Sequence, residues 1–338
     1  MSFLTNSVNK PEREITSLVD ICLPNGKLNP QAVGWSRFPL HRDNLSRWGR
    51  NKRFEYYCVT CEDFIVTANI SHHDYRANIA TTFMNLKTGK IVSNRINRWL
   101  PARGIMPDPT CPKTVSESAD GIQISIRQKS EGTRLVTHTE RLQLDALITN
   151  PRGHESMGVL VPWNDRTFQY TRKDNCLPAM GKVTVDGQEW KIEPEKCLAI
   201  HDVGRGRWPY STWWNWSVGH GYAKGRQIGL QFGGKWTVGT PSTENSLRIE
   251  GRIQKISEEL EWNYDNRDFM KPWTIRGSRV DLTFTPKIHH HHFFNKWIIS
   301  ARGDQCFGHF SGKIIADDGE VIEIESILGM AEEVHRKW

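Results

Sequence analysis

The sequence has few long apolar runs and no stretch of about 18 consecutive apolar residues, which excludes a membrane-spanning helix. Its N-terminus, MSFLTNSVNKPERE, lacks the apolar segment that a secretory signal requires. The seven cysteines are odd in number and widely spread, which is not the pattern of a disulfide framework. We therefore expect free thiols and a soluble cytoplasmic protein.

Helical periodicity is also scarce, and only part of Pro39–Asn51 and the C-terminal Met330–Trp338 favour short helices. Strand patterns dominate instead. Lys182–Ile192 consists of two alternating segments joined by Asp186-Gly187, which is a strong hairpin signal. Arg279–Thr285 alternates between apolar and polar residues, as a half-buried strand does. Many short strands with Gly-rich turns are typical of a sandwich or a barrel.

The fold class that we predict is all-β, with two antiparallel β-barrel-like halves packed together and few short helices. A pocket is expected in one barrel mouth or between the barrels. The segment 162–172 is the preferred boundary between the halves. This gives an N-terminal extension (residues 1–34), a first domain (residues 35–165) and a second domain (residues 166–338).

Nucleotide and redox motifs are incomplete. Cys58 and Cys61 form a lone C-x-x-C inside a strand pattern, where residues three apart face opposite sides, so packing explains them better than redox or zinc chemistry. Residues 229–235 match the first seven positions of a P-loop, but Trp236 stands where Ser or Thr should bind magnesium. His154 and Ser156 do not fit a nucleophile elbow, although His154 could act alone as an acid or base. We predict no cofactor.

Four consecutive histidines occur at His289–His292. On a strand, His289 and His291 share one face while His290 and His292 share the other. Two imidazoles on one face can begin a metal site. A solvated hairpin tip explains the run more simply, and we predict no metal site.

The formal charge of +7 arises from 45 basic and 38 acidic residues. The densest basic stretch, Trp35–Arg53, interleaves arginines with aromatic residues, a combination that can bind single-stranded nucleic acid. The rest of the chain has no basic stripe and no known nucleic-acid module. A small molecule is therefore the predicted partner rather than nucleic acid or a membrane, and no feature indicates an oligomeric state.

Tryptophan is unusually abundant, with 14 residues in a chain of 338. The segment His201–Trp216 combines several of them with Arg and Asp, as a concave ligand site does. The alternative is an Arg–Asp ion pair with Trp stacked beneath a loop. The candidate ligand-binding residues are Arg205, Arg207, Trp208, Tyr210, Trp214, Asn215, Lys235, Trp236 and Trp273. The candidate catalytic acids and bases are Asp202, Asp265, Asp268, Glu244 and His154.

Several long segments carry a family resemblance. They are GWSRFPLHRDNLSRWGRNKRFEYY, NCLPAMG, GRGRWPY, NWSVGHG, GGKWTVGTPSTEN, DFMKPW and GMAEEVHRKW. From about Ile15 to Trp338 the chain resembles the bacterial domain of unknown function 2804 family. That family is distantly similar to the carotenoid 1,2-hydratase group, whose members consist of two lipocalin-like β-barrels, and the resemblance implies this fold.

Enzymes of that group add water to, or cyclise, isoprenoid and polyketide-like substrates, with an Asp as the proposed proton donor. If the resemblance extends to chemistry, it implies Asp202, Asp265 or Asp268 as the acid and Trp208 or Trp214 as a wall that stabilises a cation. Fold alone does not assign function, and the residues leave open whether the protein is an enzyme.

Three functions follow as alternatives. The first is a lipocalin-like protein that acts on an apolar or amphipathic molecule such as a lipid or an isoprenoid, either as a binding protein or as an enzyme of acid-catalysed hydration or isomerisation. An anionic head group would suit Arg205 and Arg207. The second is a carbohydrate-binding or carbohydrate-active protein that uses Trp platforms and paired carboxylates. The third is a non-enzymatic interaction module, which predicts no cavity of useful size.

Overall fold

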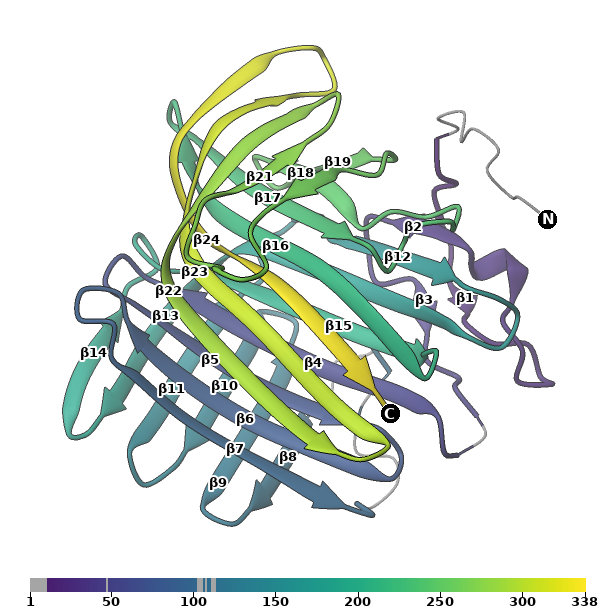
Figure 1. Cartoon of the computed structure of the whole chain (residues 1–338), viewed down its shortest axis with the longest axis horizontal. Coiled ribbons are helices and arrows are strands. Elements are labelled where there is room, and N and C mark those ends of the chain that lie inside the picture. Colours follow the sequence, from purple (N-terminus) through teal and green to yellow (C-terminus); the bar gives the residue numbers. More distant parts are fainter. Residues whose placement is uncertain (1–10, 47, 102–105, 107, 111–113) are drawn as a thin grey trace.

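The computed structural model describes residues 11–46, 48–101, 106, 108–110 and 114–338 (Figure 1). It contains a 13-stranded sheet, a nine-stranded sheet and a small two-stranded sheet formed by β1 (Val19–Asp20) and β3 (His41–Arg42). Within these residues the one helical element is a 3₁₀ turn, η1 (Pro30–Ala32). None of the described helical structure is long and apolar enough to cross a membrane.

The first sheet runs from β7 through β4, β15 and β13 to β8 and forms the first barrel. Its strands are β2 (Gly34–Ser36), β4 (Asn51–Thr60), β5 (Phe64–His72), β6 (Arg76–Asn85), β7 (Ile91–Trp99), β8 (Thr114–Ala119), β9 (Ile122–Lys129), β10 (Gly132–His138), β11 (Leu142–Thr149), β12 (Met157–Pro162), β13 (Phe168–Val185), β14 (Gln188–Ile192) and β15 (Leu198–Arg207). The two arms of this sheet curl over one core, in which Phe64 and Phe83 share a cluster with Ile124 and Leu144.

The second sheet is ordered β19-β18-β17-β16-β24-β23-β22-β21-β20 and forms the second barrel-like half. Its strands are β16 (Ser211–Ala223), β17 (Arg226–Gly234), β18 (Asn245–Ile249), β19 (Arg252–Ile256), β20 (Glu261–Asn263), β21 (Trp273–Arg276), β22 (Val280–Lys296), β23 (Ile299–Ile315) and β24 (Val321–Lys337). It encloses a core of its own that includes Phe232, Trp273 and Phe284.

The second sheet packs against the outer face of the first, and in Figure 1 strands β22 to β24 cross over β4 to β6. An inter-sheet cluster joins Cys58, Ile65 and Ile200 of the first sheet to Trp216 and Phe307 of the second. All ten residues of β15 are buried, because one of its faces lies on the first core and the other lies under the second sheet. Both faces of this strand are therefore interior.

The predicted all-β, two-barrel fold is confirmed, but the two predicted helices are wrong. Met330–Trp338 lies almost entirely in β24, where hydrogen bonds to β16 and β23 override the local helical pattern. In the described part of Pro39–Asn51 the chain forms β3 and the start of β4. The chain passes from the first sheet to the second at residues 208–210, between β15 and β16. Strands β13 to β15 therefore pair within the first sheet, whereas the predicted boundary at residue 165 assigned them to the second domain.

The expectation that all thiols are free is also wrong, because Cys61 and Cys197 form a disulfide. Cys58 and Cys61 do face opposite sides, as their spacing predicted: Cys58 lies in the inter-sheet cluster and Cys61 in the core of the first barrel. The described free cysteines, Cys22, Cys58, Cys176 and Cys306, are all buried.

Reduction of the Cys61–Cys197 bond should destabilise the protein, because the bond joins residues 136 positions apart and so restricts the unfolded chain. We expect a loss of about 3–5 kcal/mol in the free energy of unfolding, measured by urea denaturation with and without dithiothreitol. The Cys61→Ser/Cys197→Ser double variant should be insensitive to the reductant. An equal response in that variant would show that the bond does not contribute.

Candidate functional site

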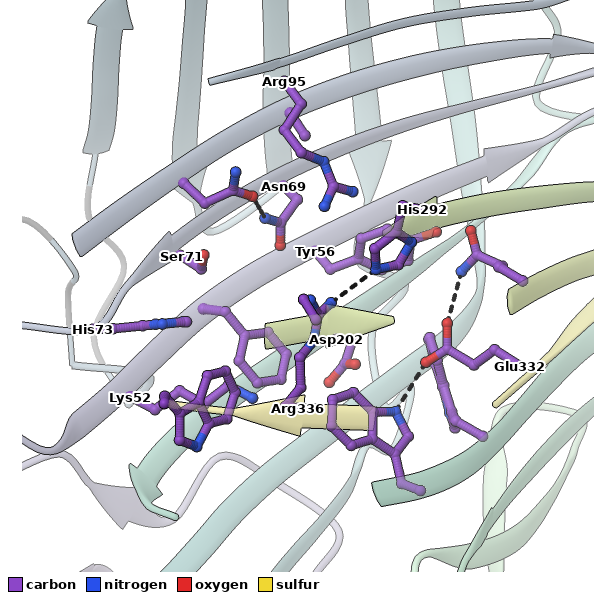
Figure 2. Close-up of a pocket in the computed structure, with 18 of the residues that line it drawn as sticks. Lys52, Tyr56, Asn69, Ser71, His73, Arg95, Asp202, His292, Glu332 and Arg336 are labelled. Carbon is purple, nitrogen blue, oxygen red and sulfur yellow. Dashed lines mark hydrogen bonds between the residues drawn. The ribbon is translucent and has the colours of Figure 1, made fainter. Parts of the chain in front are cut away.

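A cavity of about 430 Å³ lies between the two sheets. Side chains from β4 to β7, β13 and β15 line one side, and side chains from β16 and β22 to β24 line the other (Figure 2). Polar residues alternate along the outer face of the first sheet, as in Thr67, Asn69 and Ser71 of β5. The second sheet covers this polar face and thereby turns it into a cavity wall.

Two carboxylates and one lysine form a buried ion cluster in the cavity wall. Lys173 Nζ lies 2.6 Å from Asp202 Oδ2 and 3.0 Å from Glu244 Oε1. Trp236 Nε1 donates a hydrogen bond of 3.0 Å to Glu244 Oε2. Burial raises the pKa of Glu244 although Lys173 opposes the rise. Two buried carboxylates thus share the single positive charge of Lys173.

Glu332 is the third acid in the cavity, and among the described residues only neutral side chains donate hydrogen bonds to it. Trp214 Nε1 donates to Oε1 and Gln305 Nε2 donates to Oε2, each at 3.0 Å, and Figure 2 shows both bonds. Burial raises the pKa of this carboxyl, although the hydrogen bond from Trp214 and the charges of Lys173 and Arg336 oppose the rise. A carboxyl group in these surroundings is suited to donate a proton to a bound molecule.

Three arginines, Arg76, Arg95 and Arg336, form the basic side of the cavity. Arg76 is 9% exposed and its Nε has no hydrogen-bond partner in the part of the chain that the structure describes, whereas Arg95 is exposed. Burial, together with Arg95 and Arg76, lowers the pKa of Arg336 to about 9. Within the described residues none of the three forms a carboxylate ion pair. This side of the cavity is therefore suited to bind an anion.

Lys52 projects among aromatic rings beside the arginines. Its Nζ lies 3.5 Å from the centroid of Trp208, 4.3 Å from that of Trp338 and 5.2 Å from that of Trp214. Burial, with a further contribution from the charge of Arg336, lowers the pKa of Lys52 well below its usual value. The aromatic enclosure contributes cation–π attraction but no counter-ion.

Five of the residues predicted from the sequence line this cavity: Asp202, Glu244, Trp208, Trp214 and Trp236. The two arginines of the same segment do not. Since side chains alternate along β15, Arg205 and Arg207 point away from Asp202, toward the interior of the first barrel. Arg205 Nη2 pairs with Glu55 Oε1 at 2.5 Å, and Arg207 Nη1 donates to the Gly26 carbonyl. Arg205 also pairs with Asp43 at 3.3 Å, so it forms the Arg–Asp ion pair of the alternative interpretation, with Glu55 as a further partner.

The other predicted acids and bases also lie outside the cavity. Asp265 pairs with Lys271 at 2.8 Å near the surface, and Asp268 accepts a hydrogen bond from the backbone of Met270. His154 Nε2 lies 2.9 Å from the Asn175 carbonyl, and burial, with the charge of Arg248, lowers its pKa to about 4.

The remaining predicted ligand residues belong to the second barrel or to the surface. Trp273 is fully buried in the second core, and Tyr210 is exposed and donates to the Ile298 carbonyl. Asn215 and Lys235 both contact the hydroxyl of Tyr264. Lys235 and Tyr264 line a separate pocket of about 330 Å³.

Sequence reasoning missed Lys52, Lys173, Glu332 and the arginine group. A usable signal was present at the C-terminus. If GMAEEVHRKW is taken as a strand, Glu332, Arg336 and Trp338 fall on one face, and the structure places all three in the cavity. The helical interpretation of that segment concealed the pattern.

The chain belongs to the family described as domain of unknown function (DUF2804), whose model matches residues 12–338. The family resemblance found in the sequence is thereby confirmed. No curated protein matches the sequence significantly.

Solved structures share the fold at low sequence identity. A protein of Nitrosomonas europaea named as an AttH has a TM-score of 0.53 and 9% identity, with 84% of this chain and 92% of that chain covered. Kievitone hydratase from Nectria haematococca has a TM-score of 0.53 and 11% identity, with 86% and 89% covered. These matches support the predicted lipocalin-like two-barrel architecture.

Removal of the Arg205 charge should cost stability and leave the cavity intact. Arg205→Met removes the arginine that pairs with the buried Glu55 and leaves only His201 beside it among the described residues, so we expect a loss of about 3–5 kcal/mol in the free energy of unfolding by urea denaturation. Arg134→Met, which removes an exposed pair with Asp145, is the matched control and should change little. Comparable losses in the two variants would contradict the structural role of Arg205.

Lys52 should make stability depend on alkaline pH. A lysine whose pKa is lower in the folded state binds fewer protons there than in the unfolded chain, so stability rises with pH up to about 10.5. Urea denaturation at pH 7 and pH 9.5 should show this rise in the native protein and a smaller rise in Lys52→Met. The exposed Lys224→Met is the control and should retain the native slope. If the free energy of unfolding changed equally with pH in all three proteins, the Lys52 amine would not be desolvated.

Proposed function

We propose that the protein binds an amphipathic small molecule that carries an anionic group, in the cavity between the sheets. The observation that carries this proposal is that Arg76, Arg95 and Arg336 line one cavity and form no carboxylate ion pair within the described residues. A ligand carboxylate or phosphate would supply the missing charge, and the Trp-rich wall would contact an apolar body. The volume of about 430 Å³ is within the range of small-molecule sites.

Acid-catalysed hydration or isomerisation is the chemistry that this cavity supports best. The Glu332 carboxyl would give its proton to a carbon of a ligand double bond, leaving a carbocation at the adjacent carbon. In hydration, water adds its oxygen to that carbon and loses a proton to a carboxylate of the Asp202–Glu244 pair. In isomerisation, the cation loses a proton from a neighbouring carbon instead. The ring of Trp214, whose N–H holds Glu332, would stabilise the cation.

The alternatives from the sequence fit the cavity less well. A sugar platform needs a free ring face, but Lys52 occupies the face of Trp208 at 3.5 Å, and the Trp214 ring packs T-shaped against Trp208 with the ring centroids 5.2 Å apart. Asp202 and Glu244 share one lysine rather than standing apart as an acid and a nucleophile. A purely structural interaction module predicts no cavity of this size.

Binding of cis-parinaric acid and of its methyl ester, followed by fluorescence, tests the proposal because the two probes differ in the negative charge and otherwise only by one methyl group. We expect the acid to bind at least 10-fold more tightly, which corresponds to about 1.4 kcal/mol. Arg336→Gln should remove most of the preference for the acid, whereas Trp214→Ala should lower the affinity for both probes. Arg134→Gln, on the surface of the first barrel, is the control. Equal binding of acid and ester, or an Arg336→Gln variant that keeps the preference, would overturn the assignment.

A further inference from the structure

The strand β22 presents its histidines to two different environments. His290 and His292 line the cavity between the sheets. His289 and His291 project from the opposite face, where His289 lies against the ring of Phe269. On the neighbouring strand β23, Asp304 is the cross-strand partner of His291. Two imidazoles and one carboxylate are thus brought together outside the proposed ligand cavity.

The three side chains converge on a single oxygen atom. His289 Nε2 lies 3.0 Å from Asp304 Oδ1, and His291 Nδ1 lies 2.7 Å from the same oxygen. The three potential ligand atoms all lie within 4.8 Å of one another. Asp304 is buried, whereas about half of the His291 side chain is exposed, so an ion has access from solvent.

We propose that His289, His291 and Asp304 form a binding site for a divalent transition metal ion, with Zn²⁺ as the best-suited ion. Two imidazoles and a carboxylate are a common protein ligand set for such ions. In a tetrahedral Zn²⁺ site, metal–ligand bonds of about 2.1 Å separate neighbouring ligand atoms by about 3.4 Å, which is somewhat longer than the two N–O distances and lies within the 4.8 Å spread of the three ligand atoms. Binding therefore requires small side-chain shifts and the loss of any proton on the two coordinating nitrogens.

The surroundings of Asp304 are compatible with this role. Arg302 Nε lies 2.8 Å from Oδ2, the oxygen that the histidines do not contact, so it can orient the carboxylate and leave Oδ1 for the ion. Its positive charge would weaken binding, but Glu333 lies 3.9 Å from Arg302 Nη1, and His335 Nε2 lies 3.0 Å from Glu333. The site thus has acidic as well as basic neighbours.

Three protein ligands would leave coordination positions for water or another small ligand. Arg302, Glu333 and His335 also line the separate pocket of about 330 Å³, so the site adjoins a space that solvent can fill. The inference does not depend on the ligand of the inter-sheet cavity, and either proposal can fail without the other.

Isothermal titration of the metal-stripped full-length protein with Zn²⁺ alone tests the site. We expect one equivalent to bind and, by mass action, to raise the melting temperature. The His289→Ala/His291→Ala variant should bind Zn²⁺ at least about 100-fold more weakly, and Asp304→Asn about 10-fold or more. Co²⁺ in place of Zn²⁺ should give a visible absorption band that is lost in the same variants.

The matched control is His290→Ala/His292→Ala, which removes the same number of histidines from the other face of the same strand. It should retain Zn²⁺ binding. Equal loss in the two double variants would show that the histidine run chelates the ion as an exposed tract, and the proposal would be wrong. Absence of Zn²⁺ binding and of a Co²⁺ band in the native protein would equally overturn it, whatever the folding of the variants.

Discussion

The packing of the second sheet on the outer face of the first is the constraint on which the rest of the structure depends. A barrel strand normally has one face on the core and one in water, and the polar residues of β4 to β6 alternate as that arrangement requires. Here the second sheet covers the outward face. In one part of the interface between the sheets, apolar residues such as Ile65 and Phe307 pack in a common cluster. In the neighbouring part, polar residues line the cavity.

The buried charges of the protein fall into two groups that differ in how they are balanced. In the first barrel, burial opposes ionisation of Glu55, but Arg205 and His201 outweigh it and lower the pKa of Glu55 to about 2. That network satisfies its own charge and serves stability. On the basic side of the cavity, Arg76 and Arg336 are desolvated, and no described carboxylate forms an ion pair with either of them. Such an arrangement is costly for the fold alone and is typical of a site that receives a charged ligand.

Because side chains alternate along a strand, residues close in sequence face different environments and belong to different sites. On β15, Asp202 faces the cavity while Arg205 faces the first barrel. On β22, His292 contacts Arg336 in the cavity while His291 contacts Asp304 on the other side of the sheet. One strand can thus serve two sites because both of its faces are covered by protein or border a pocket.

The sequence by itself determined the fold class. The alternating segments and the Asp186-Gly187 turn require strands and hairpins, and these are local properties of the chain. It also located half of the site, because Trp208, Trp214, Trp236, Asp202 and Glu244 lie in segments whose composition is unusual for a core. The helical pattern of the C-terminal segment was misleading because two neighbouring strands, distant in sequence, supply its hydrogen bonds.

Only the tertiary structure decided which polar residues became functional candidates. The pattern of β4 to β7 is that of a solvated face, and nothing local distinguishes Lys52 or Arg76 from surface residues until the second sheet covers them. Likewise, the Cys61–Cys197 bond and the His289–Asp304 contact depend on strand pairing between separate segments. Local sequence sets which face a side chain occupies on its strand, but burial and charge balance depend on what packs against that face.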